Sequence, residues 1–396
     1  NKKDSMKVLF ISHKPPYPIV DGGCHAMDRM LRDFLFTYPE ASITYLSLAT
    51  EKHPFDKNAI PSDLVGSVDF MSTQISTRIN AIAALIHLFN KQSYNISRFK
   101  KKSAITLINS LISKNKFDVI VFESLFAGAY VDEIKKLTKA KLIYRAHNIE
   151  HTIWEDLSKR ESNPFKKWYL KHLSKRLKTF EFDFLKKINL TLSISEMDQS
   201  IFTKNTENDC KYIPVSMPSM KKYTGAKNSL CFLGAFNWMP NKEGISWYVD
   251  NVHEQLINKF PEMNLEIAGS FSQEISHLSE KPKIRLHGFV DSSMDFISSH
   301  GVFIAPILSG SGVKMKVLEA MSLGVPCVLS KKAAEGLNLP DIIPVCNSKN
   351  EFIEKLSLLL IDEDLCKQIG LAGQEFIQKE FSTDVVSKKL ITSLKL

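Results

Sequence analysis

Short apolar segments alternate with longer helical patterns along the chain, and this alternation constrains the fold more than any other feature of the sequence. Each apolar segment is five to seven residues long and has few charges. Continuous apolar strands separated by helices are typical of a parallel sheet whose two faces are both covered by helices. The expected strands of the first series are 7–12, 42–48, 117–122, 141–146 and 190–195.

The alternation stops and then begins again, which indicates a second domain. A segment with proline, glycine and lysine at 218–228 is typical of a linker, and 396 residues are about twice the length of a typical domain. We therefore expect an α/β protein with two Rossmann-like doubly wound domains over 1–215 and 216–381, and a C-terminal helix, about 382–396, that packs back on the first. The expected strands of the second series are 229–234, 265–269, 283–288, 301–306 and 325–330.

Charge and cysteine content limit the partners and the compartment. The formal net charge of +9 suits anionic partners, whether nucleoside diphosphates, acidic lipids or nucleic acid. The six cysteines form no C-x-x-C pair, which favours a reducing compartment. The apolar stretch Val8–Ile11 is too short for a signal peptide, and 82–89 is too short to cross a bilayer. We expect a cytoplasmic protein, attached at most to a membrane surface.

The segment 309–330 has the most distinctive chemistry of the sequence. Gly310 and Gly312 surround a turn between an expected strand and a helix, where the backbone can approach a phosphate closely. Lys314 and Lys316 add positive charge, and Glu319 lies one turn beyond Lys316, where it could accept hydrogen bonds from ribose hydroxyls. An ordinary helix start with solvated lysines is the alternative.

Several segments resemble a known family, and they follow one another in the order found in that family. The segment LEAMSLGVP resembles the signature of the retaining GT-B glycosyltransferases of the "glycosyl transferases group 1" family. The resemblance covers nearly the whole chain. The other segments that carry it are RAHNIEH (145–151), SISEMD (193–198), GAFNWMPNKEGISWYV (234–249), LHGFVDS (286–292) and AAEGL (333–337).

The resemblance implies two domains that face each other across a cleft, with a UDP- or GDP-sugar donor. No metal or other cofactor is expected, because the helix N-terminus with Lys314 and Lys316 can stabilise the leaving diphosphate. The resemblance also implies catalytic roles for His147, Lys316 and Glu319. The family has a glutamate eight positions before Glu319, where this sequence has Ser311, so the contacts to the donor sugar are left open. The residues implied to bind the donor are Gly22, Gly23, Gly234, Asn237, Val290, Gly310, Ser311, Gly312, Val313 and Lys314.

Three candidates of the first domain lie just after expected strands. His147 is expected to face the cleft, where the resemblance implies contact with the donor sugar, although a single histidine is more often structural. Glu123 either binds acceptor hydroxyls or is a surface or helix-capping carboxylate. Gly22 and Gly23 do not form a G-x-G-x-x-G motif, which counts against a dehydrogenase. They allow close approach of a ligand or make a simple turn.

A long amphipathic helix is expected over 163–188, capped by Asn163 with Pro164 in its first turn. Its apolar stripe comprises Phe165, Trp168, Tyr169, Leu173, Leu177, Phe180, Phe184 and Ile188. Its lysines lie largely elsewhere, at Lys166, Lys167, Lys171, Lys175 and Lys178. The helix either packs on its own domain with a solvated basic face or contacts anionic lipid headgroups.

The expected function is transfer of a sugar from a nucleoside diphosphate to a hydroxyl of a glycan or lipid-linked glycan, as in bacterial surface polysaccharide assembly. The resemblance implies retention at the anomeric carbon. The expected partners are the donor, the glycan acceptor and an anionic membrane surface, with no nucleic acid. A nucleotide- or glycan-binding protein without catalysis, or a nucleotide-sugar epimerase on the same fold, is the alternative.

Overall fold

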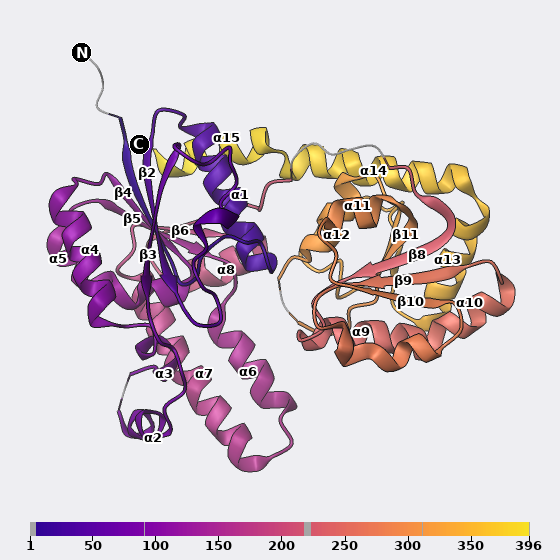
Figure 1. Ribbon diagram of the computed structural model, residues 1–396, viewed down its shortest axis with the longest axis horizontal. Helices are drawn as coiled ribbons and strands as arrows, with labels where there is room; N and C mark the ends of the chain where they lie inside the picture. The colour runs from indigo at the N-terminus through magenta and orange to yellow at the C-terminus, as the bar shows by residue number, and fades with distance from the viewer. Residues whose placement is uncertain (1–4, 91, 218–222, 311, 396) are drawn as a thin grey trace. The chain divides into compact units, whose positions relative to one another are not determined.

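The computed structural model describes residues 5–90, 92–217, 223–310 and 312–395. The chain divides into two compact units (Figure 1). The N-terminal unit consists of residues 1–215 and 386–396, and the C-terminal unit of residues 216–385. Each unit has a parallel sheet with helices on its faces, so the expected α/β fold class with two doubly wound domains is confirmed.

The sheet of the N-terminal unit has seven parallel strands among the described residues, in the order β3-β2-β1-β4-β5-β6-β7. The central strands are continuous apolar runs because both of their faces are covered. The strands are β1 (Lys7–Ser12), β2 (Ser42–Ala49), β3 (Val68–Gln74), β4 (Val119–Glu123), β5 (Lys141–Ala146), β6 (Leu190–Ser193) and β7 (Asp209–Tyr212).

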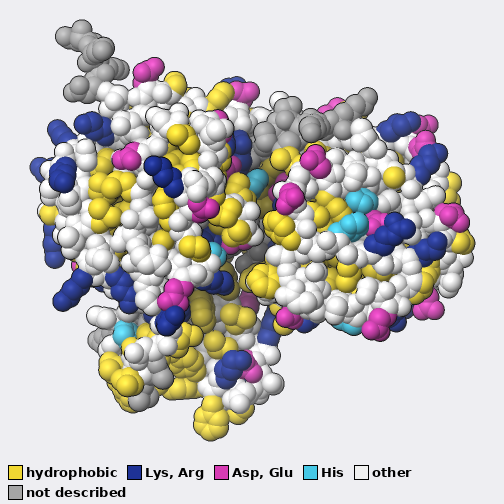
Figure 2. All heavy atoms as spheres, viewed as in Figure 1, with side chains coloured by type: hydrophobic (Ala, Val, Ile, Leu, Met, Phe, Trp, Pro, Cys, Tyr) yellow, Lys and Arg dark blue, Asp and Glu magenta, His cyan; other side chains and the backbone are white. Residues whose placement is uncertain are grey.

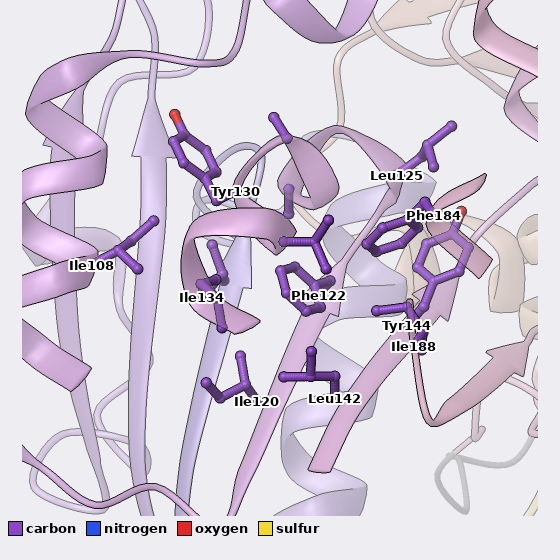
Figure 3. Packing of buried hydrophobic residues seen from close by; sticks show 14 of the residues in the cluster. Ile108, Ile120, Phe122, Leu125, Tyr130, Ile134, Leu142, Tyr144, Phe184 and Ile188 are labelled. Carbon is purple, nitrogen blue, oxygen red and sulfur yellow. The ribbon is translucent and has the colours of Figure 1, made fainter. Parts of the chain in front are cut away.

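Helices cover both faces of this sheet. The apolar cluster on one face joins the strands to α4, α5 and α7, and Figure 3 shows Phe122, Tyr144 and Phe184 meeting there. The rings of Phe122 and Tyr144 both contact that of Phe184 edge-on, with centroids 5.5 and 5.1 Å away. The helices are α1 (Gly22–Thr37), α2 (Ala81–Phe89), α3 (Tyr94–Ser97), α4 (Lys102–Lys114), η2 (Leu125–Tyr130), α5 (Val131–Leu137), α6 (Glu150–Arg160), α7 (Pro164–Leu185) and α8 (Glu196–Asn205).

The end of the chain belongs to the N-terminal unit. Val386, Leu390 and Leu394 of α15 (Thr383–Leu394) are buried in the cluster on the other face of the sheet, with residues of α1. The Nζ atom of Lys141 donates a hydrogen bond to the carbonyl of Leu394. The last helix therefore completes the core of the first unit.

The sheet of the C-terminal unit has six parallel strands among the described residues, in the order β10-β9-β8-β11-β12-β13. Its strands are β8 (Ala226–Leu233), β9 (Asn264–Ala268), β10 (Ile284–Gly288), β11 (His300–Ala305), β12 (Cys327–Ser330) and β13 (Val345–Cys346). Its helices are α9 (Met239–Tyr248), η3 (Val249–His253), α10 (Glu254–Lys259), η4 (Ser272–Glu280), α11 (Ser293–Ser298), α12 (Met315–Ser322), α13 (Lys349–Ile361) and α14 (Glu363–Phe381). No helix of the described residues is long and apolar enough to cross a bilayer.

Candidate functional site

In the C-terminal unit, the glycine-rich turn lies where the strand order reverses. β8 pairs with β9 on one side and with β11 on the other. In open parallel sheets, ligands bind outside the carboxyl ends of the strands at such a point. Gly234 directly follows β8, and the turn with Gly310 and Gly312 follows β11. The topology thus brings together two segments that the sequence pattern selected separately.

Both glycines of the turn are needed for its conformation. Gly310 has φ +88° and Gly312 has φ +78°, in the left-handed region that side chains rarely adopt. A Cβ atom on Gly310 would lie 3.0 Å from the Cγ atom of Pro240, so the turn also packs closely on the start of α9. Ser311, an expected donor-binding residue, lies outside the described residues.

Lys314 is the N-terminal flanking residue of α12, and its side chain folds back over the turn. Its Nζ donates a hydrogen bond to the Gly312 carbonyl oxygen at 2.6 Å. Burial, and then the charge of Lys332, lower the pKa of Lys314 to about 8, while Glu335 acts in the opposite direction. The amine is thus partly deprotonated near pH 8, and an anion bound beside it would favour its charged form. Val313, also expected at the donor site, is half-buried in the same turn.

Glu319 and Lys316 form an ion pair on the first turns of α12. The Nζ atom of Lys316 lies 2.8 Å from both carboxylate oxygens of Glu319. The hydroxyl of Ser293 donates a hydrogen bond to Glu319 Oε2 at 2.9 Å. Glu319 is buried, so the side chain expected to meet ribose hydroxyls is satisfied by protein groups here. A ligand would bind it by displacing one of these partners.

The loops after β8 and β10 supply the remaining expected donor contacts. Gly234 is buried beside Asn241, whose side chain donates to the Ala235 carbonyl at 3.0 Å. Asn237 is exposed and Val290 is half-buried. The neighbour of Val290, Phe289, is 67% exposed. This aromatic side chain lies in the segment 286–292 and is open to solvent, where it could stack on a nucleobase; it was not among the residues expected from the sequence.

In the N-terminal unit, polar residues gather at the corresponding reversal of strand order, between β1 and β4. Lys14, just after β1, is buried and forms an ion pair with Asp21 at 2.5 Å. Asp21 caps α1 by accepting a hydrogen bond from the backbone N–H of Cys24 at 2.9 Å. Burial opposes ionisation of Asp21, but Lys14 and this N–H outweigh it and lower its pKa to about 2.

Gly22 and Gly23 begin α1 beside this ion pair. A Cβ atom on Gly23 would lie 3.2 Å from Asp21 Oδ1 and 3.4 Å from the Lys14 Nζ atom. Gly23 therefore leaves room for the pair, which is a reason for glycine that the sequence alone did not reveal. The pair holds a buried ammonium at the carboxyl end of β1.

Glu123 and His147 form a buried hydrogen-bonded pair. Glu123 ends β4, His147 follows the neighbouring strand β5, and Glu123 Oε2 lies 2.8 Å from His147 Nε2. His147 is only 7% exposed and Glu123 is fully buried. From its place after an expected strand, His147 was expected to face the cleft. Its ring lies against the Glu123 carboxylate, and this hydrogen bond orients the ring.

His13 and Ser124 complete this group, and neither was expected. Ser124 Oγ lies 2.7 Å from His13 Nδ1, and Ser124 has the unusual φ of +89° for a residue other than glycine. Burial, then the charges of Lys14 and His147, lower the pKa of His13 to about 3, so this imidazole is neutral at physiological pH. The sequence feature that could have indicated His13 and Ser124 is the presence of polar residues immediately after the expected strands 7–12 and 117–122.

The described residues contain no group of three or more histidine, cysteine, aspartate or glutamate side chains arranged to hold a metal ion. At the two strand-order reversals Lys14 pairs with Asp21, Lys316 with Glu319 and His147 with Glu123, whereas Lys314 donates to a backbone carbonyl. The arrangement can bind an anion at the α12 turn and can position one imidazole beside the first sheet.

Comparisons with known proteins identify the fold. Residues 227–362 match the family described as Glycosyl transferases group 1. An uncharacterized 44.6 kDa protein in the cps region of Klebsiella pneumoniae is 26% identical over 426 aligned residues, which cover 98% of each chain.

Two solved structures show that the similarity extends over both units. Sucrose-phosphate synthase from Thermosynechococcus elongatus has a TM-score of 0.73 at 12% identity, with 98% of both chains covered. HepE of Anabaena, solved in complex with UDP and glucose, has a TM-score of 0.64 at 12% identity, with 98% of this chain and 99% of that chain covered. At sequence identities this low, the structural similarity shows that the fold is shared.

Proposed function

Because this chain has the GT-B glycosyltransferase fold and its residues 227–362 match the Glycosyl transferases group 1 family, we propose that it transfers a sugar from a UDP- or GDP-sugar to a hydroxyl of a glycan. The observation that carries the proposal is the turn before α12. Gly310 and Gly312, both with left-handed backbone conformations, lie at the strand-order reversal of the unit that matches the family. Lys314, whose pKa is lowered by burial, lies beside them. Because the similarly folded HepE was solved with UDP, we propose a uridine nucleotide as the first candidate for the donor.

In this proposal the C-terminal unit binds the donor. The backbone N–H groups at the start of α12 and the positive end of its dipole hold the diphosphate, and Lys314 adds a full charge. Glu319 turns from Lys316 toward the ribose hydroxyls, which frees the Lys316 ammonium for the phosphates. The Lys316–Glu319 pair satisfies the buried carboxylate, and donor binding exchanges this partner for the ribose hydroxyls.

The leaving group determines what these groups do in the reaction. As the bond between the anomeric carbon and the diphosphate oxygen breaks, negative charge develops on that oxygen. Preorganised donors aimed at developing charge are typically worth ~10²–10³ in rate each. The helix N-terminus, Lys314 and Lys316 provide such donors without a metal ion, so we propose a metal-independent enzyme.

His147 acts from the N-terminal unit in this proposal, as the residue that contacts the donor sugar. Glu123 is a positioning residue, because it is fully buried and bonded to the His147 ring. This assignment replaces the expectation that Glu123 binds acceptor hydroxyls directly. A residue without exposure in the ligand-free protein suits orientation of a neighbour better than capture of a glycan.

We propose retention at the anomeric carbon with attack from the face that the diphosphate leaves. The acceptor oxygen bonds to the anomeric carbon, the bond to the diphosphate breaks, and the acceptor proton passes to the departing diphosphate oxygen. The reaction needs no enzymatic nucleophile.

The six cysteines, all free and five of them buried, support a reducing compartment such as the cytoplasm.

The test is acceptor-dependent release of nucleoside diphosphate. The protein is incubated with UDP- and GDP-sugars, with and without an extract of cellular glycans and lipid-linked glycans. Release only with extract, together with a labelled sugar on the acceptor, supports the proposal. An altered sugar still joined to the nucleotide would indicate an epimerase. Binding of nucleotide with no release under any condition would indicate a binding protein.

A further inference from the structure

Exposed apolar side chains of the N-terminal unit are concentrated in two segments away from the candidate site. Among the large hydrophobic residues of the described chain, the four most exposed are Phe89 at 85%, Phe165 at 83%, Ile79 at 75% and Ile82 at 72%. All four come from the region of α2 or from the start of α7. Single exposed apolar residues are common on protein surfaces, but a group of large apolar side chains that are all highly exposed is uncommon.

The two segments belong to one surface of the unit. α3 contacts both α2 and α7. The ring of Tyr94 in α3 lies 5.2 Å from that of His87 in α2, and its hydroxyl accepts a hydrogen bond from the N–H of Asn80 at 2.8 Å. Figure 2 shows hydrophobic side chains over α2 and over the α6–α7 hairpin on the same face. We name this surface, with Ile79, Ile82, Ile86, Phe89, Leu157, Phe165 and Trp168, the apolar face.

α7 divides into two halves with different roles. Its C-terminal half packs into the core through Leu177, Phe184 and Leu185, as expected for a helix that stabilises its own domain. Its first turns carry Phe165 and Trp168 into solvent instead. The packing alternative therefore holds for the C-terminal part of the helix, and the exposed part is the one at the end of the hairpin.

The charge around the apolar face is strongly positive. Residues 70–117 contain eight lysines and arginines and no aspartate or glutamate, and two of the eight are paired with acidic residues from outside this segment, Arg78 with Glu51 and Lys100 with Glu133. Residues 162–180 contain six lysines and arginines and likewise no acidic residue. Among the acidic residues of the hairpin, Glu161 pairs with Lys166 at 2.6 Å, and Glu155 and Asp156 share Lys159 at 3.1 and 3.3 Å.

We propose that the apolar face inserts into the interface of an anionic lipid bilayer. Apolar side chains that reach the headgroup boundary with lysines beside them are typical of helices that lie in a membrane surface. Lys167, Lys171 and Lys175 are exposed on α7 and would approach the anionic headgroups while Phe165 and Trp168 enter the acyl boundary. The proposal does not rest on glycosyl transfer, because none of these residues belongs to the candidate site.

The apolar contribution is tested by changing Ile82, Phe89, Phe165 and Trp168 together to serine. These side chains are exposed, so the variant is expected to fold. Sedimentation is measured with vesicles of equal parts phosphatidylglycerol and phosphatidylcholine at low salt. Burial of each large apolar side chain contributes about 1.5–3 kcal/mol when complete, so we expect at least a hundredfold weaker binding.

The matched control is Val65→Ser with Ile361→Ser, which removes side chains of similar exposure, 66% and 69%, outside the apolar face. This variant is expected to bind vesicles like the parent. The variant Lys167→Gln, Lys171→Gln and Lys175→Gln is expected to bind roughly a hundredfold more weakly at low salt, from about 1 kcal/mol per lysine. The difference should shrink at high salt because charges are screened.

Insertion, as opposed to surface attraction, is read from Trp168. Its fluorescence should be quenched by vesicles with brominated acyl chains, and the Trp168→Phe variant should lose that quenching while it still sediments. The proposal is overturned if the parent does not bind the anionic vesicles at low salt, or binds phosphatidylcholine alone equally well. It is also overturned if the serine variant binds like the parent. Light scattering that shows a parent dimer, separated by the serine substitutions, would assign the apolar face to a second copy of the chain.

Discussion

Lys314 offers the sharpest prediction, because the structure makes its charge depend on pH in an accessible range. Burial and Lys332 lower its pKa to about 8 in the ligand-free protein. The amine is then about nine-tenths charged at pH 7 and about one-tenth charged at pH 9. A bound diphosphate favours the charged form, so binding raises the pKa of Lys314 and takes up a proton.

The magnitude follows from these fractions. If the charged amine binds the diphosphate and the neutral amine does not, the Kd for UDP rises about tenfold between pH 7 and pH 9. About half a proton is taken up per nucleotide at pH 8. The sign is fixed, because the bound state holds more protons than the free state, and affinity must therefore fall as pH rises.

The assay is isothermal titration with UDP at several pH values, in buffers of different ionisation enthalpy. The control is Lys314→Arg, whose side chain stays charged throughout. Comparison with this variant cancels ionisation of the nucleotide itself. A tenfold loss in the parent and little loss in the variant would support the reasoning. The same pH dependence in both proteins, or no proton uptake by the parent at pH 8, would refute it.

Three further predictions concern Glu319, the Glu123–His147 pair and two glycines of the C-terminal unit. Glu319→Ala is expected to weaken UDP binding by about 1.5–3 kcal/mol, since the ribose hydroxyls lose a charged acceptor, and unchanged affinity in a titration would remove Glu319 from the site. His147→Ala is expected to lower both turnover and melting temperature, because it leaves the buried Glu123 carboxylate unpaired, at a cost of about 3–5 kcal/mol. The double variant with Glu123→Ala should recover the melting temperature and not the turnover, and recovery of both would make the pair purely structural. Gly269→Ala should prevent folding of the C-terminal unit, because its Cβ atom would lie 1.7 Å from the Gly234 carbonyl oxygen. The control Gly336→Ala places its Cβ atom with no neighbour within 4 Å and should lower the free energy of unfolding by only about 1–2 kcal/mol. Similar thermal unfolding of the two variants would contradict this prediction.

The sequence predicted the elements whose pattern is local. The buried strands β1 and β5 lie at the expected residues, because continuous apolar runs mark strands covered on both faces. The edge strands β3 and β7 were not among the expected strands. Their sequences, VDFMSTQ and DCKY, mix polar and apolar residues, as suits strands that are only partly covered. The turn before α12 was predictable because two glycines between a strand and a helix mark a backbone that needs positive φ.

The pairings within the sites could not be predicted, because they depend on strand register and on contacts between distant residues. Glu123 and His147 are 24 positions apart and meet because β4 and β5 pair in parallel. The Lys14–Asp21 pair depends on the path of the loop between β1 and α1. The exposed half of α7 is also a tertiary property, since nothing in its periodicity shows where the underlying core ends.

Amide hydrogen exchange of the full chain with and without UDP tests whether the turn before α12 and the start of that helix hold the donor diphosphate. Exchange should slow in peptides that cover 309–319 and 234–241, with no such protection in α6 and α7. The Lys314→Gln variant should need a higher concentration of UDP to show the same protection. Protection confined to the N-terminal unit, or none at a concentration of UDP that raises the melting temperature, would contradict the account.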